Sequence, residues 1–146
     1  MTVTYRDVAS TTGTDASAEG TLPAGVQNGD IMLAFLSHSV ASATMTTPAT
    51  GWDLLISDPN PNDFSCLCYK RVFQTGDGNP TWTWSGAGNW TVDIIAYSDQ
   101  DTTTPIDASG GNQELADDNI LPTPSLTPSV VGCMLVVYGI VDATGG

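Results

Sequence analysis

Hydrophobic and polar residues follow a short-range pattern along this chain, in stretches separated by turn-forming residues. Apolar side chains at every second position are typical of β-strands that bury one face. Residues 31–36 (Ile-Met-Leu-Ala-Phe-Leu) are continuously apolar and predict a strand buried on both faces. The other stretches that predict strands are residues 2–8, 52–57, 64–73, 81–84 and 90–97.

The remaining segments are rich in Gly, Pro, Ser, Thr and Asn. Residues 10–20 are compatible with a loop or with a weak edge strand, and residues 98–119 form a long acidic connection. Prolines keep residues 120–127 extended, because proline disfavours both a helix and a central strand. The apolar run at residues 130–141 predicts a strand that closes the fold.

No segment shows a sustained helical period, and the length suits one domain. The sequence therefore predicts an all-β fold, an antiparallel β-sandwich or jelly-roll-like domain of about eight strands over residues 1–146. Residues 1–28 supply its N-terminal strand and a Ser/Thr/Gly-rich segment. The predicted core residues are Ile31, Leu33, Phe35, Leu67, Trp90, Ile94, Leu135 and Val137.

The charge balance restricts the possible partners. Three basic residues against 16 acidic ones give a formal net charge of −13. Three cations cannot neutralise a run of phosphates, so nucleic acid and anionic membrane surfaces are excluded as partners. The first residues lack a secretory leader, and the longest apolar run is too short for a membrane-spanning helix, so we expect a soluble protein.

The cysteines and the single histidine allow one metal site to be considered. Cys66, Cys68 and Cys133 could bind a metal together with His38, but neither their spacing nor a CxxC pair matches zinc patterns. Small buried apolar residues in a sheet are the commoner role of such cysteines. We therefore expect no metal and no cofactor.

Catalytic groups are scarce. His38 could serve a Ser-His-Asp triad, but no nucleophile-elbow motif accompanies it, and a structural histidine is the favoured interpretation. Asp117 and Asp118 could act as paired carboxylates, yet they lie in a polar segment that offers no source for a raised pKa. No catalytic residue is predicted, and we expect a protein that is not an enzyme.

Two binding hypotheses remain. Asp99, Asp101 and Asp107 could offer oxygens to calcium, although the EF-hand spacing is absent. Trp82 and Trp84 lie two residues apart and so share one face of a strand, where exposed rings would stack on sugars. Packing of these two rings in the sandwich core is the favoured alternative, because large aromatic side chains are usually buried.

Several short motifs follow one another through most of the chain, between Gly29 and Val141. They are Gly29-Asp30-Ile-Met-Leu-Ala-Phe-Leu, Pro48-Ala-Thr-Gly51-Trp52-Asp-Leu-Leu, Tyr69-Lys-Arg71-Val, Thr81-Trp-Thr-Trp84-Ser, Ala96-Tyr97 and Asp101-Thr-Thr-Thr-Pro105-Ile-Asp107. Their order and spacing resemble a β-sandwich module found in structural proteins of tailed bacteriophages and prophages.

The resemblance implies a virion component assembled in the host cytoplasm, with no catalytic residues. A capsid decoration or cement protein, homo-oligomeric as a closed ring such as a trimer, is the principal expectation, with other virion proteins as partners. A tail or fibre module that binds host carbohydrate through Trp82 and Trp84 is the alternative. The resemblance also makes the acidic segment from Asp99 to Asp107 a shared structural connection.

Two features bear on assembly. Members of this group continue beyond the position of Val141, so the resemblance implies either a shortened module or a sheet completed by a neighbouring subunit. Lysine, which commonly protects sheet edges from pairing, occurs only at position 70. The sequence therefore predicts sheet edges that partner chains cover.

Overall fold

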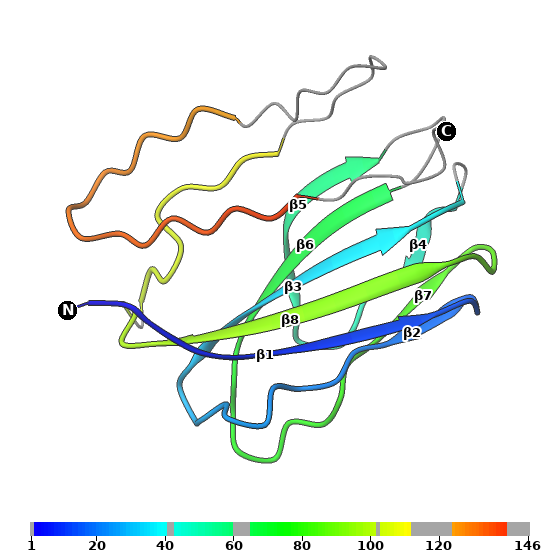
Figure 1. Cartoon of the computed structure of the whole chain (residues 1–146), viewed down its shortest axis with the longest axis horizontal. Helices are drawn as coiled ribbons and strands as arrows, with labels where there is room; N and C mark the ends of the chain where they lie inside the picture. The colour runs from blue at the N-terminus through cyan, green and yellow to red at the C-terminus, as the bar shows by residue number, and fades with distance from the viewer. Residues whose placement is uncertain (1, 41–42, 60–64, 102, 112–123, 140–146) are drawn as a thin grey trace.

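The fold is all-β in the computed structural model, which describes residues 2–40, 43–59, 65–101, 103–111 and 124–139. These residues contain no helix and form eight strands, as the sequence predicted (Figure 1). The strands are β1 (Thr4–Gly13), β2 (Ser17–Glu19), β3 (Ile31–His38), β4 (Met45–Thr47), β5 (Asp53–Pro59), β6 (Ser65–Val72), β7 (Thr81–Trp84) and β8 (Trp90–Ser98).

Two antiparallel sheets make up the sandwich. The larger has the order β1-β8-β3-β6-β5, and the smaller has the order β2-β7-β4. In a jelly roll the first strand pairs with the last, the second with the second-last, and so on inward. Here β1–β8, β2–β7 and β3–β6 follow this scheme, but β4 and β5 do not pair, because β5 pairs only with β6. The strands therefore divide five to three, and the jelly-roll form of the prediction is not confirmed.

The main core fills the space between the sheets. Residues that alternate along β3 and β8 point toward the smaller sheet, where Trp82 and Trp84 meet them. This alternation is the period of two that the sequence shows. The fully or nearly fully buried members from the larger sheet are Met32, Ala34, Leu36, Leu67, Tyr69, Trp90, Val92, Ile94 and Ala96.

The outer face of the larger sheet is apolar as well. Ile31, Leu33 and Tyr97 form a second buried cluster there, with Phe35 and Ile95 packed against it. The prediction that residues 31–36 are buried on both faces is therefore confirmed, since five of these six side chains are buried and Phe35 is half-buried. Most of the predicted core is also confirmed, through Ile31, Leu33, Leu67, Trp90 and Ile94.

The predicted closing strand is wrong for the part of it that the structure describes. Residues 130–139 contain no strand, and the side chains of Leu135 and Val137 are 72% and 63% exposed instead of lying in the core. The segment has no partner strand among the described residues, and it crosses the outer face of the larger sheet. Residues 120–123 of the predicted extended segment lie outside the described residues.

The sheet edges are protected by means other than lysine. β1, β4 and β5 are edge strands, and each has a register shift of the kind that a β-bulge produces. Acidic residues also occur on edge strands, as Asp7 on β1, Glu19 on β2 and Asp53 on β5. Lys70 lies on the interior strand β6, so the described edge strands carry no lysine, and bulges and negative charges interrupt them. That partner chains cover these edges stays a prediction.

Candidate interaction surface

The chain leaves the sandwich after β8. Residues 99–101, 103–111 and 124–139 contain no strand, and in Figure 1 they form the yellow, orange and red loop that extends beyond the sheets and returns toward them. We call residues 124–139 the arm. It returns across the outer face of the larger sheet, where the second apolar cluster lies.

Two inward side chains attach the arm. Val136 packs against the outer cluster together with Ile106. The ring of Tyr138 stacks on Phe35 with 4.3 Å between ring centroids and an interplanar angle of 14°, and its hydroxyl donates a hydrogen bond to Asp93 on β8. Burial, together with this hydrogen bond, raises the pKa of Tyr138 above its usual value, so the phenol is neutral at physiological pH.

Asp107 stabilises the turn at residues 129–132, which precedes the part of the arm that packs on the sheet through Val136 and Tyr138. Its carboxylate accepts hydrogen bonds from the backbone and side chain of Ser129, and Gly132 adopts a left-handed φ of 82° in the same turn. The side-chain bond from Ser129 is the main cause that lowers the pKa of Asp107. The thiol of Cys133 also lies 3.8 Å from this carboxylate.

The arm also exposes apolar side chains. Val131 is fully exposed, and burial alternates residue by residue from 135 to 139, as it does along a strand. No residue from 130 to 138 carries a charge. We call this set the apolar row; its members are Val130, Val131, Met134, Leu135 and Val137.

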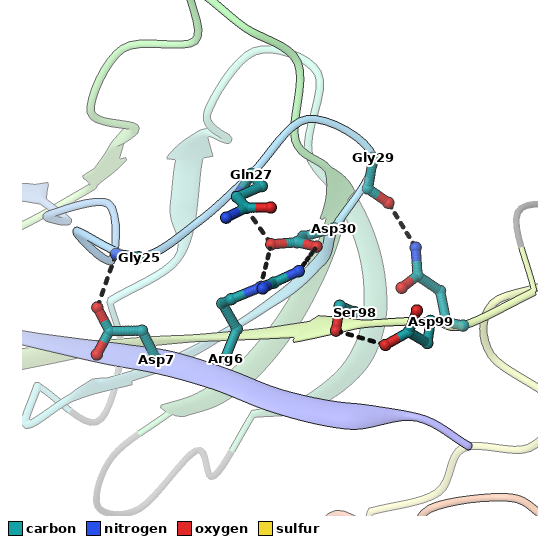
Figure 2. Close-up of polar contacts among 9 residues, drawn as sticks. Arg6, Asp7, Gly25, Gln27, Gly29, Asp30, Ser98 and Asp99 are labelled. Carbon is teal, nitrogen blue, oxygen red and sulfur yellow. Dashed lines mark hydrogen bonds and ion pairs between the residues drawn. The ribbon is translucent and has the colours of Figure 1, made fainter. Parts of the chain in front are cut away.

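A polar junction lies where the loop before β3 meets β1 (Figure 2). Arg6 is the extra residue at the bulge of β1, and its guanidinium makes a bidentate ion pair with the buried Asp30, at 3.1 and 3.2 Å. Asp30 also accepts a hydrogen bond from the amide of Gln27 at 2.8 Å. Asp7 accepts one from the amide of Gly25, so these groups brace the loop.

A polar hollow of about 290 Å³ lies at one end of the sandwich, with Trp52 and Asn79 in its wall. Arg71 and Asp77 form a bidentate pair there, and Asp77 also accepts a hydrogen bond from the amide of Gln74. The bond from Arg71 lowers the pKa of Asp77. These charged groups thus satisfy one another and hold the β6–β7 loop.

Glycine is required at one position beside this hollow. Gly51 has a φ of 78°, and a Cβ built on it would lie 1.7 Å from Nη1 of Arg71. The same guanidinium donates to the carbonyl of Thr50 at 3.4 Å. The turn before β5 therefore comes close to Arg71 only because residue 51 has no side chain.

Trp82 and Trp84 do not form a sugar-binding platform. Both side chains are buried between the sheets, with Trp82 against Trp52 and Tyr69, and Trp84 against His38. Their alternation brings them to the inner face of β7, where the larger sheet covers them. The structure therefore corrects the glycan hypothesis, and core packing is the role that these rings have.

The three aspartates proposed for calcium have separate local roles. Asp99 has a left-handed φ of 62° and accepts a hydrogen bond from Ser98. Asp101 accepts bonds from the amides of residues 103 and 104, and Asp107 caps the turn at Ser129. No group of three or more His, Cys, Asp or Glu side chains in the described part of the chain is placed to hold a metal ion.

The residues of the thiol–histidine hypothesis are also apart. His38 is buried on the inner side of β3, beside Trp84, whereas Cys68 pairs in register with Phe35 and so belongs to the outer face of the sheet. Burial raises the pKa of the Cys68 thiol to about 12. Cys133 lies exposed on the arm. Asp117 and Asp118 lie outside the described residues.

No protein-family model, curated protein or solved structure matches this chain. In the described part of the chain, no helix is long and apolar enough to cross a membrane. The apolar row is the surface that the sequence reasoning missed, because it assigned the same residues to the core. Their uncharged, apolar pattern is also that of a buried strand, so the sequence carries no signal that separates the two positions.

Proposed function

We propose that this chain is a non-enzymatic structural protein of a tailed-phage virion, and that it decorates the capsid shell and stabilises it through contacts between subunits. The resemblance in motif order supports the virion context. The single structural observation in favour of an assembly role is the apolar row, since five neighbouring apolar side chains are exposed on one segment. Soluble monomers rarely expose a contiguous apolar patch without a binding role.

The remaining architecture suits such a role. The sandwich has two apolar layers, one between its sheets and one beneath the arm, so its strands are held from both faces. A net charge of −13 keeps individual copies apart until an apolar surface brings them together. A closed ring around a symmetry axis of the shell, such as a trimer, would join two different surfaces of each copy, the same two in every copy.

Quantitative mass spectrometry of purified virions tests the proposal. We expect the chain in a fixed ratio to the major capsid protein, and we expect purified chain to rebind shells from which it has been stripped and to raise their melting temperature. A copy number that matches a tail component would contradict the capsid position. Absence of the chain from virions would overturn the structural role altogether.

A further inference from the structure

We propose that Asn28 is a deamidation site whose reaction the folded chain suppresses, because hydrogen bonds to the β6–β7 loop hold both of the reacting groups. Asn28 is the only asparagine in the sequence that a glycine follows. Its side chain is exposed to water, and it forms the turn before β3 together with Gly29 (Figure 2). This chemistry is independent of the proposed function.

The reaction needs only these two residues and water. The backbone nitrogen of Gly29 attacks Cγ of Asn28, the new N–C bond closes a succinimide ring, and the Cγ–Nδ2 bond breaks. The proton of the Gly29 amide passes through solvent to the departing nitrogen, which leaves as ammonia. Water then opens the ring at either carbonyl and gives aspartate or isoaspartate at position 28. Glycine permits the attack because it has no side chain to hinder the approach.

The fold restrains both partners of this attack. The amide of Gly29 donates a hydrogen bond to the carbonyl of Phe73 at 2.9 Å, so its N–H must leave this acceptor before it can lose the proton. Oδ1 of Asn28 accepts a hydrogen bond from the amide of Thr75 at 3.0 Å. Movement of Cγ to bonding distance of the nitrogen therefore strains or breaks a second contact with the same loop.

The turn is held by further bonds. The amide of Asp30 donates to the carbonyl of Gln27 at 2.9 Å, and Gly29 has a φ of 90°, as in a type II turn. The carbonyl of Gly29 accepts a bond from the side-chain amide of Gln100 at 2.6 Å (Figure 2). The amide of Phe73 also donates to the carbonyl of Asp30 at 2.8 Å. Deamidation thus requires the turn and the loop to open together, and its rate follows the population of that open state.

The two products should differ in their effect on the turn. Aspartate at position 28 keeps an oxygen that can accept the bond from the amide of Thr75. Isoaspartate lengthens the main chain by one carbon between Gln27 and Gly29, inside the turn that the bond from Asp30 to Gln27 closes. The same carbon separates the amide of Gln27 from the carboxylate of Asp30, which accepts its bond at 2.8 Å. Isoaspartate should therefore leave the turn open.

Peptide mapping of the full chain by mass spectrometry tests the suppression. Folded protein and protein in concentrated urea are incubated at the same mildly alkaline pH. We expect Asn28 to convert at least roughly tenfold more slowly in the folded chain, because local opening limits the reaction there. Urea below the unfolding transition should accelerate the conversion progressively. Equal rates in the folded and unfolded chain, or no conversion in urea, would overturn the proposal.

Two variants of Thr75 test the hydrogen bond from its amide. Thr75 is the second residue of a turn that the amide of Asp77 closes on the carbonyl of Gln74 at 2.9 Å. Gly76 follows with a φ of 99°, which is the type II form that accommodates proline at the second position. Thr75→Pro therefore keeps the turn but removes the donor, and it should accelerate deamidation of the folded chain about two- to tenfold.

Thr75→Ala is the matched control. It removes the hydroxyl, which lies 3.5 Å from Oδ1 of Asn28, but it keeps the amide, so the rate should stay close to that of the wild type. The urea midpoint of each variant establishes that folded chains are compared. Equal rates in Thr75→Pro and Thr75→Ala would contradict the restraint by this bond.

The stability of the products tests the effect on the turn. Chromatography separates the isoaspartate form, and its urea midpoint should lie below that of Asn28→Asp, which carries the same charge without the added backbone carbon. Equal midpoints of the two forms would contradict the opening of the turn by isoaspartate.

Discussion

His38, which the sequence allowed as a catalytic residue, is buried in the interior of the sandwich. Its ring is fully buried and lies 4.6 Å from that of Trp84, measured between centroids. Nδ1 accepts a hydrogen bond from the amide of Val40 at 3.2 Å, and Nδ1 must therefore be unprotonated. Burial lowers the pKa of His38 below its ordinary value of 6.5, so the folded chain holds the ring neutral.

This lowered pKa makes stability depend on pH. Below pH 6.5 His38 takes up a proton in the unfolded chain but stays neutral in the folded chain. The contribution of neutral His38 to the free energy of unfolding should therefore be fully present above pH 6.5 and should be lost as the pH falls toward the folded-state pKa. Urea denaturation between about pH 7 and pH 5.5 measures this slope, over a range chosen to lie above carboxylate titration. In His38→Gln the slope should be smaller, and an unchanged slope would contradict the assignment.

Arg71 and Asp77 illustrate charged residues whose role is structural. Their bidentate pair joins β6 to the following loop, and both side chains are less than a quarter exposed. Asp77→Asn should lower the free energy of unfolding by about 1–2 kcal/mol, because it weakens a charge-assisted pair and the bond to the amide of Gln74. Chemical denaturation measures the change. Asp15→Asn removes the same charge from an exposed bend and should have almost no effect.

At the level of elements, the two faces of β3 have different roles. Leu36 points into the core between the sheets, and its neighbour Phe35 points to the outer face, where it stacks on Tyr138 of the arm. The sandwich is thus built on one face and the arm is attached to the other. All four tryptophans are buried, and they belong to the core between the sheets.

Adjacent substitutions on β3 should therefore separate the two layers. Leu36→Ala should cost about 2–5 kcal/mol and shift tryptophan fluorescence, since it leaves a cavity between the sheets. Phe35→Ala should cost less, about 1–2 kcal/mol, and should leave the fluorescence unchanged while proteolysis within residues 124–139 accelerates. Urea titration, emission spectra and mass spectrometry of the fragments measure these effects. An equal fluorescence shift in both variants would contradict the separation of layers.

For the molecule as a whole, the negative charge opposes the compact state. The chain has sixteen acidic and three basic residues, and two of the basic ones, Arg6 and Arg71, form ion pairs with Asp30 and Asp77. Most of the carboxylates therefore repel one another across the surface. Self-repulsion of this kind destabilises a folded chain and is reduced by salt.

Stability should accordingly rise with ionic strength. From about 0.01 M to about 0.15 M salt the screening length falls from about 30 Å to about 8 Å, and the urea midpoint should increase over that range. The measurement requires a protein concentration at which the chain sediments as a monomer. The Asp15→Asn/Asp53→Asn double variant removes two exposed charges and should show a smaller increase. A midpoint independent of salt would contradict the role of repulsion.

The sequence alone was enough to predict the all-β class, the strand at residues 31–36 with its two buried faces, and most of the core, because strand periodicity and continuous apolar runs are local properties of the pattern. It also predicted no nucleic-acid partner, because the net charge follows from composition alone. It favoured core positions for Trp82 and Trp84, which the structure confirms, but it did not reveal β4, whose three residues carry no pattern.

The place of the apolar run at residues 130–139 follows from the fold and not from its own pattern. Its pattern is that of a core strand, but a strand enters a core only when another strand accepts its backbone and a sheet covers its side chains. Here the outer face of the larger sheet covers Val136 and Tyr138, and nothing in the described chain covers Leu135 and Val137. Whether a side chain is buried depends on the residues that pack against it, and residues distant in the sequence come together only in the fold.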